Sequence, residues 1–197
     1  MAWGGDMRVL VACEYSGRVR DAFIAKGHDA ISCDLLQTET DGPHVQGDVS
    51  ALLRDPWDLV IAHPPCTYLA NSGVRWLHSD PARWGKMREG AAFFLECLNA
   101  NAPMVAVENP VMHKYARQEI GGLYPDFTVQ PWQFGDPAKK RTCFWTRNLP
   151  ALSPTSDMTA KDARADCHLA PPGPDRWKER SRTYQGIADA MASQWAI

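Results

Sequence analysis

The chain has 197 residues, a formal net charge of −2, 45% hydrophobic residues and 22% charged residues. This length suits one domain with a full-sized core, and the apolar and aromatic content excludes an intrinsically disordered chain. No apolar run reaches the roughly 18 residues that a membrane span requires, so we expect a soluble intracellular protein with no membrane partner. The balanced charge also excludes a strongly cationic surface over the whole molecule, although not one local basic face.

The cysteines do not form a disulfide pattern. The six residues are Cys13, Cys33, Cys66, Cys97, Cys143 and Cys167. They are scattered and include no CxxC pair, so we expect free thiols. His63 with Cys66, and Cys167 with His168, come closest to the spacing of zinc ligands, but no second pair has finger-like spacing. We therefore expect no metal site.

Short apolar runs alternate with amphipathic stretches along the chain. The apolar runs predict strands over residues 8–13, 29–34, 44–46, 58–62 and 104–108, followed by two further strands over 127–131 and 142–146. Helical spacing predicts helices over 16–26, with Ser16 as N-cap, over 81–101, in the stretch ending at Ile120, and over 181–195. Residues 147–180 hold much proline and little periodicity, which indicates a long irregular connection.

This alternation predicts the fold class. Apolar strands separated by helices are typical of an α/β protein, in which a mostly parallel, twisted sheet is covered by helices on both faces. Ligands of such sheets bind beyond the carboxyl ends of the strands. We therefore expect the functional residues directly after the predicted strands.

Polar residues follow the first three strands. The turn after the first strand is Cys13-Glu14-Tyr15-Ser16-Gly17, and backbone N–H groups at such a helix start can approach an anionic or polar ligand. An ordinary strand-to-helix turn explains it equally well. Asp34 ends the second strand, where nucleotide-binding folds place a carboxylate for ribose hydroxyls, although a surface turn also favours Asp. Asp48 could accept from an exocyclic amine or cap a short helix that starts near Ser50.

The next two strand ends are more informative. His63-Pro64-Pro65-Cys66 follows a buried strand, and the two prolines stiffen the backbone that presents Cys66. A cysteine held in this way suits a nucleophile, and a buried structural cysteine is the alternative. Glu108-Asn109-Pro110 follows the next buried strand, where a carboxylate is costly unless it has a partner or a task. The two strand ends together predict a nucleophile and an acid that face one crevice.

These motifs resemble those of a known family. Pro65-Cys66 and Glu108-Asn109 look like the two central motifs of the cytosine-C5 DNA methyltransferases, in the same order and context. Lys139-Lys140-Arg141 is similar to the family's basic pair before a strand, and Tyr184-Gln185-Gly186 is similar to its C-terminal motif, which folds back onto the cofactor. The resemblance implies a Rossmann-like, S-adenosylmethionine-dependent methyltransferase fold and a single methyltransferase domain over residues 1–197.

The resemblance also implies roles for individual residues. Cys66 would add to C6 of a cytosine flipped out of DNA, Glu108 would bind N3 and the 4-amino group, and Arg141 would be the third catalytic residue. The residues implied to bind S-adenosylmethionine are Cys13, Glu14, Tyr15, Ser16, Gly17, Asp34, Asp48, Pro64 and Gly186. Independently of the resemblance, we expect the basic residues Arg75, Lys139, Lys140 and Arg141 to bind nucleic acid, because aromatic residues lie close to them in the sequence. A solvated helix face explains Arg75 equally well.

One large region of the family is missing. Residues 147–180 stand where the family has a large target-recognition domain and are too few to form one, which resembles a compact, phage-like form. We expect DNA contacts from the basic residues or from a second subunit in a homodimer, and a cytoplasmic location in a bacterial host or phage-infected cell. Three alternatives stay open: the same chemistry on RNA or a free cytosine nucleotide, an amino-methyltransferase with its proline pair, and a catalytically inactive binding protein.

Overall fold

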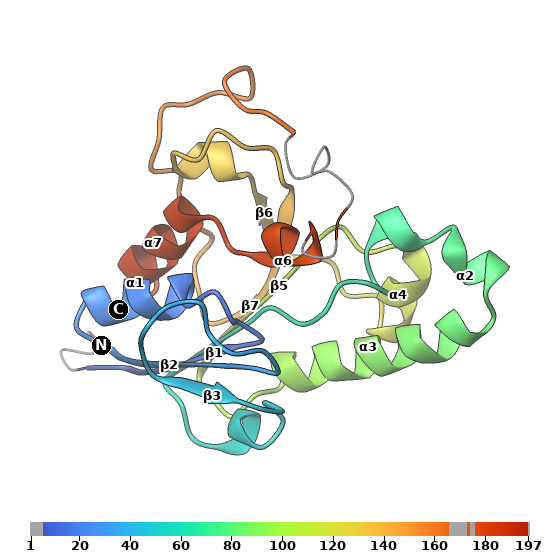
Figure 1. Cartoon of the computed structure of the whole chain (residues 1–197), viewed down its shortest axis with the longest axis horizontal. Coiled ribbons are helices and arrows are strands. Elements are labelled where there is room, and N and C mark those ends of the chain that lie inside the picture. Colours follow the sequence, from blue (N-terminus) through green and yellow to red (C-terminus); the bar gives the residue numbers. More distant parts are fainter. Residues whose placement is uncertain (1–5, 166–172, 174–175, 197) are drawn as a thin grey trace.

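The computed structural model describes residues 6–165, 173 and 176–196, and its centre is a seven-stranded sheet (Figure 1). The strands are β1 (Arg8–Ala12), β2 (Asp29–Asp34), β3 (His44–Gln46), β4 (Leu59–Ala62), β5 (Met104–Asn109), β6 (Phe127–Val129) and β7 (Thr142–Arg147). Their order across the sheet is β3-β2-β1-β4-β5-β7-β6. The first five strands are parallel, whereas β7 runs antiparallel to both of its neighbours. The mostly parallel sheet is therefore confirmed.

Helices cover both faces of this sheet. On one side α1 (Arg18–Ala25) packs against α7 (Gln185–Gln194), and the other carries α3 (Ala82–Leu98) with α2 (Trp76–Ser79) and α4 (Lys114–Glu119) (Figure 1). Among the described residues, the remaining helical elements are η1 (Leu52–Arg54), η2 (Asn71–Gly73), η3 (Pro131–Phe134) and α6 (Arg176–Ser181). No helix in the described part of the chain is long and apolar enough to cross a membrane.

The central strands are apolar on both sides because each side meets a helix layer. Leu10 and Val60 belong to the apolar cluster that includes Phe94 of α3. Their neighbours in the strands belong to a second cluster, which includes Phe23 of α1 and Met191 of α7. Removing both faces from water stabilises the sheet by about 25 cal/mol for each Å² of apolar surface buried. The near-continuous apolar runs of the sequence reflect this two-sided burial.

The start of α1 differs from the prediction. Gly17, and not Ser16, occupies the N-cap position, with a left-handed φ of 75°. The side chain that caps the helix is the buried carboxylate of Glu14, which accepts the N–H groups of Val19 at 2.7 Å and Arg20 at 3.3 Å. Glu14, which has a longer side chain and lies earlier in the turn than Ser16, thus accepts backbone N–H groups of the first helical turn that have no acceptor within the helix.

The C-terminal region also differs from the prediction. The last helix begins at Gln185 instead of residue 181, and the separate helix α6 precedes it. Residues 147–180 are therefore not irregular throughout, because α6 begins at Arg176. Cys167 and His168 lie outside the described residues.

Candidate active site

The register of the sheet brings the predicted site residues to one edge. Ala12 of β1 pairs with Cys33 of β2 and with Ala62 of β4, which in turn pairs with Val107 of β5. The residues that follow these positions are Cys13, Asp34, His63 and Glu108. The antiparallel strand β7 begins at the same edge, because Asn109 pairs with Cys143. One edge of the sheet thus carries the turn after β1, two carboxylates and the basic segment before β7.

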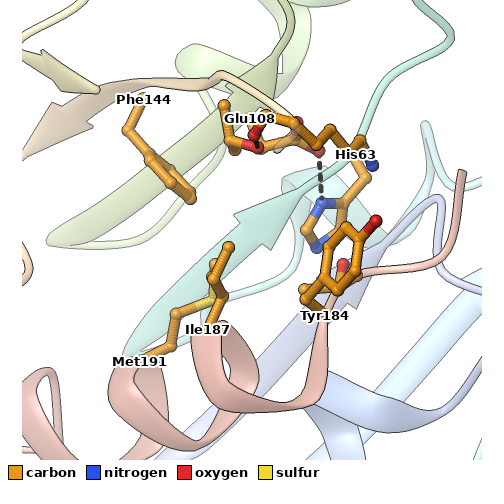
Figure 2. A pocket seen from close by; sticks show the side chains of 9 residues that line it. His63, Glu108, Phe144, Tyr184, Ile187 and Met191 are labelled. Carbon is orange, nitrogen blue, oxygen red and sulfur yellow. Dashed lines mark hydrogen bonds and ion pairs between the residues drawn. The ribbon is translucent and has the colours of Figure 1, made fainter. Parts of the chain in front are cut away.

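A small pocket opens at this edge between the sheet and α7 (Figure 2). It is lined by His63, Glu108, Lys140, Thr142, Phe144, Thr183, Tyr184, Ile187 and Met191. Phe144, Ile187 and Met191 provide an apolar wall, whereas His63, Glu108 and Lys140 are ionisable. This combination of apolar walls with a few convergent polar groups is typical of a ligand site.

His63 and Glu108 form a buried pair in this pocket. Nδ1 of His63 lies 3.1 Å from Oε2 of Glu108, and the two side chains are only 8% and 13% exposed. Burial raises the pKa of Glu108, but the hydrogen bond from His63 and the positive charge of Lys140 outweigh it, so the pKa lies below its ordinary value. Glu108 is therefore a carboxylate at neutral pH.

Cys66 lies half-buried in the turn that follows β4. Its carbonyl oxygen accepts the N–H groups of Leu69 at 3.0 Å and Ala70 at 2.9 Å, which closes the turn. Burial raises the pKa of the Cys66 thiol and the charge of Glu108 raises it further, while Lys140 and Arg180 lower it without cancelling the rise. Cys66 does not line the pocket itself, but the charges of Glu108 and Lys140 act on its thiol.

The basic segment before β7 contributes Lys140 to the pocket. Lys140 Nζ lies 5.9 Å from the centre of the Tyr184 ring. Arg141, for which the resemblance implies a catalytic role, is exposed. Burial raises the pKa of the neighbouring Cys143 to about 11, and the charge of Arg141 opposes that rise. Successive side chains of an extended segment point to opposite sides, so only one of these neighbours can face the pocket. Lys140 lines the pocket and Arg141 does not, and a catalytic role for Arg141 stays a prediction.

The side chains of Glu14, Tyr15 and Ser16, in the turn after β1, form hydrogen bonds within the protein. The Ser16 hydroxyl donates to Glu14 at 3.1 Å, and both oxygens of Glu14 accept from α1. The Tyr15 hydroxyl bonds the carbonyl of Lys178 in α6 at 2.5 Å. These side chains thus fix the shape of the turn, and their predicted contact with a cofactor stays a prediction.

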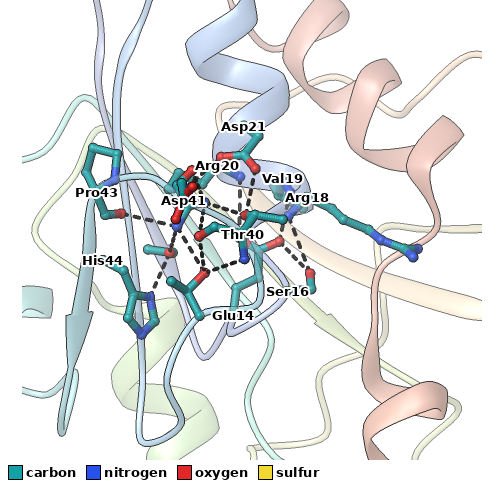
Figure 3. Close-up of polar contacts among 12 residues, drawn as sticks. Glu14, Ser16, Arg18, Val19, Arg20, Asp21, Thr40, Asp41, Pro43 and His44 are labelled. Carbon is teal, nitrogen blue, oxygen red and sulfur yellow. Dashed lines mark hydrogen bonds and ion pairs between the residues drawn. The ribbon is translucent and has the colours of Figure 1, made fainter.

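A buried arginine that the sequence analysis missed holds the neighbouring loop (Figure 3). The Arg20 side chain is fully buried, and it donates to Asp21 at 2.8 Å and to the Thr40 hydroxyl at 2.7 Å. The loop of Thr40 also carries Glu39, whose carboxylate accepts two hydrogen bonds from Arg182, at 2.6 and 2.8 Å. This network ties α1, the loop after β2 and the segment before α7 together. An arginine in an amphipathic helix ordinarily faces water, so the sequence carried no signal for it.

Three predicted cofactor residues lie at the carboxyl ends of β1, β2 and β3. The pKa of Cys13 is raised by burial and, in addition, by the nearby charges of Asp34 and Asp48. Asp34 is half-buried, and burial raises the pKa of its carboxyl. Asp48 is exposed, and it accepts the N–H of Ser50 at 2.8 Å, which is the capping contact considered from the sequence. The charges of Asp34 and Asp48 therefore both act on the Cys13 thiol.

Gly186 and Pro64 make close contacts inside the fold. The N–H of Gly186 donates to Asp136 Oδ2 at 2.9 Å, and a Cβ built on Gly186 would overlap the backbone of Phe134. The carbonyl of the buried Pro64 accepts from the Asn109 side chain at 3.2 Å. Gly186 thus allows α7 to approach the end of η3 and Asp136 closely. This close packing is a structural reason for a glycine at this position.

Three of the four predicted nucleic-acid residues, Arg75, Lys139 and Arg141, are exposed, whereas Lys140 is half-buried at the pocket. Arg75 is exposed, with its guanidinium 4.6 Å from the centre of the Trp76 ring, and Arg83 stacks on Tyr68, two residues after Cys66, at 4.7 Å. Lys139 is also exposed. Within residues 6–165, 173 and 176–196, no three His, Cys, Asp or Glu side chains are grouped so that they could hold a metal ion.

Comparisons with known proteins find similarity in structure but not in sequence. No family model and no curated protein matches the chain by sequence. A DNA modification methyltransferase encoded within an Escherichia coli prophage is similar in structure, with a TM-score of 0.52, 18% identity, and coverage of 85% of this chain and 56% of that one. A methyltransferase of Entamoeba histolytica gives a TM-score of 0.47 and 15% identity, and covers 86% of this chain and 61% of that one. The chain spans less than two thirds of either neighbour's length.

The sheet order, the helix layers and the prophage neighbour define the class. The chain has a Rossmann-like methyltransferase fold. Its carboxyl edge, where such folds bind ligands, is the edge that carries the site described above.

Proposed function

We propose that this chain transfers a methyl group from S-adenosylmethionine to C5 of cytosine in DNA through a covalent adduct on Cys66. The observation that carries the proposal is the grouping of a cysteine after β4, a buried carboxylate at the end of the neighbouring strand β5, and Lys140 acting electrostatically on both. A nucleophile and an acid at adjacent strand ends are what this reaction needs.

Carbon 5 of cytosine is a weak nucleophile and requires covalent activation. The Cys66 sulfur would form a bond to C6, and the electron pair of the C5–C6 double bond would become available at C5. After C5 has bonded to the methyl group, loss of its proton to a base would restore the double bond and expel Cys66 as a thiolate. Lys140 and Arg180 favour the thiolate that begins and ends this sequence.

Glu108 would act on the base. Its carboxylate can accept a hydrogen bond from the 4-amino group, and after taking up a proton it can donate to N3 as negative charge develops on the ring. The His63 bond and the burial of both side chains hold the carboxyl group in one orientation. This supports a direct role for Glu108 in the reaction.

S-adenosylmethionine would supply the methyl group as an electrophile. The carboxylates of Asp34 and Asp48 near Cys13 suit ribose hydroxyls and the adenine amine, respectively, while the backbone of residues 13–17 and Pro64 would line the cofactor. An unpartnered buried nitrogen of His63 at the same edge indicates that a polar ligand group belongs there. The residues present thus fit this cofactor.

DNA is the favoured substrate. The prophage-encoded neighbour is described as a DNA modification methyltransferase, and exposed cations with aromatic partners, such as Arg75 with Trp76, suit a phosphate backbone with a base-stacking surface. Lys139 and Arg141 would extend this surface beside the site. In duplex DNA the target base must leave the stack to reach Cys66.

A free cytosine nucleotide or RNA is the second candidate substrate. The observation in its favour is the short connection between β7, which ends at Arg147, and α6, which begins at Arg176. A small recognition surface would suit a short or single-nucleotide substrate.

The test is nucleoside mass spectrometry after incubation with labelled S-adenosylmethionine and duplex DNA, RNA or dCMP. We expect 5-methylcytosine in DNA and, with 5-fluorocytosine DNA, a covalent adduct that Cys66→Ser abolishes. Cys97→Ala, at a buried cysteine of α3 that does not line the pocket, is the matched control and should retain the adduct. Absence of methylated product from all three substrates, or an adduct that persists in Cys66→Ser, would refute the proposal.

A further inference from the structure

The His63 ring has one nitrogen that the protein does not use. Its side chain is 8% exposed, Nδ1 faces Glu108, and Nε2 is buried with no hydrogen-bond partner among the described residues. Figure 2 shows the ring between Glu108 and Tyr184, at the pocket. A buried polar atom without a partner is destabilising, and a ligand group that pairs with it would remove that cost.

The Glu108 bond determines which form of the ring is present. A carboxylate can only accept, so the Nδ1 atom of His63 must carry the hydrogen of their shared bond. In the neutral ring, Nε2 is then left with its lone pair and is an acceptor. Other charged or titratable groups near this pair include Lys140 from the segment before β7, Tyr184 at the start of α7, Cys66 after β4 and Asp34 after β2.

We propose that His63 determines ligand specificity by accepting, at Nε2, a hydrogen bond from an amine group of the bound ligand. This inference rests on the proposed function, because it assigns part of that same site. The His63 ring is in the form that is protonated at Nδ1, and the ligand group that meets Nε2 is a hydrogen-bond donor. A carbonyl or carboxylate oxygen at that point would face the lone pair and be rejected.

Two ligands of the proposed reaction carry such a group. One is the 4-amino group of the target cytosine, which Glu108 would also bind, and the other is the α-amino group of S-adenosylmethionine. The shared chemistry is an amine N–H beside an apolar wall formed by Ile187 and Met191. Separate measurements on cofactor and base distinguish the two sources.

The ring form can be measured without any ligand. Long-range 1H–15N NMR correlation of the full-length protein at mildly alkaline pH, where a free imidazole is neutral, reports which nitrogen is protonated. We expect Nδ1 to be protonated and Nε2 to be unprotonated. Glu108→Gln should weaken this preference, since an amide can accept or donate. Protonation at Nε2 in the wild-type protein would overturn the inference.

Two substitutions separate the roles of the two nitrogens. His63→Asn places an amide N–H near the Nδ1 position and removes the acceptor, whereas His63→Gln reaches toward the Nε2 position and loses the bond to Glu108. His28→Asn, at the opposite end of β2, is the matched control. Calorimetry with S-adenosylmethionine alone, and trapping rates with DNA containing 5-fluorocytosine or 2-pyrimidinone, which lacks the 4-amino group, provide the readouts.

Each source predicts a different pattern. If the cofactor amine is the donor, His63→Asn should weaken S-adenosylmethionine binding about tenfold, the usual effect of one buried hydrogen bond. If the base amine is the donor, cofactor binding should be unchanged, and adduct formation should slow about tenfold with 5-fluorocytosine but not with 2-pyrimidinone. A merely structural role would slow both substrates equally.

Failure of the inference about His63 can be distinguished from failure of the proposed function. A wild-type protein that binds, traps and methylates, with a His63→Asn variant equal to it in every assay, would overturn this inference and leave the proposed function standing. Equal loss with both trapping substrates at unchanged cofactor binding would likewise overturn it. A wild-type protein inert toward all substrates would refute the proposed function, and this inference would fall with it.

Discussion

Replacing Gly186 by Ala should destabilise the protein, although helix propensity alone predicts the opposite. Gly186 lies in the first turn of α7, where alanine ordinarily stabilises a helix by about 0.5–1 kcal/mol relative to glycine. A Cβ at this position would lie 2.8 Å from the carbonyl carbon of Phe134 and 3.0 Å from Asp136 Oδ2, and would also overlap the Phe134 carbonyl oxygen. Backbone atoms cannot rotate away as the end of a side chain can, so α7 or the loop after η3 must move.

The expected cost is at the upper end for overpacking, about 3 kcal/mol. For a domain of this size, 1 kcal/mol shifts the Tm by about 2–4 °C, so the Gly186→Ala Tm should fall by about 6–12 °C. Calorimetry or circular dichroism of the protein without cofactor measures this. Gly85→Ala is the matched control: Gly85 lies within α3, a Cβ there meets no atom within 4 Å, and the Tm should rise by a few degrees.

A Gly186→Ala protein that melts at or above the wild-type temperature would show that packing against Phe134 is not the reason for this glycine. The cofactor role implied by the sequence resemblance would then be the better explanation. A drop in Tm without cofactor, together with a drop of equal size in its presence, supports the packing role.

Three further predictions concern charge and capping. The pH at which iodoacetamide alkylates Cys66 at half its maximal rate should lie above that of a free thiol, because burial raises the pKa of Cys66. This pH should be lower in Glu108→Gln, which removes a negative charge, and higher in Lys140→Gln, which removes a positive charge. Glu14→Ala should lower the free energy of unfolding by about 1–3 kcal/mol, since two N–H groups lose their acceptor, and urea titration measures the loss. Burial lowers the pKa of His113, whose neutral Nδ1 accepts a hydrogen bond at the start of α4. The contribution of His113 to the free energy of unfolding should therefore be constant above about pH 6.5 and decline as the pH falls below that value. Urea titrations at pH 7.5 and 5.5 measure this decline, which should be smaller in His113→Asn.

The sequence alone determined the strands and therefore the edge at which the site residues lie. Strands buried on both faces must be apolar throughout, so their ends are marked by the first polar residue, and parallel strands end at one edge. Cys66 and Glu108 could be predicted together for this reason. The sequence also contains a signal for His63, because His63 directly follows one apolar run and Glu108 directly follows the next apolar run. The sequence does not show the strand register that allows the two side chains to form a hydrogen bond.

Tertiary structure decided the contacts between residues far apart in the chain. His63 and Glu108 meet because β4 pairs with β5, across a separation of 45 residues. Whether Lys140 or Arg141 faces the pocket depends on the phase in which the segment enters β7, and a shift of one residue would exchange them. Arg20 looks like a solvent-facing helix residue until the loop after β2 closes over it. Local patterns specify which segments form strands and helices, whereas pairing, phase and burial arise only when those segments pack together.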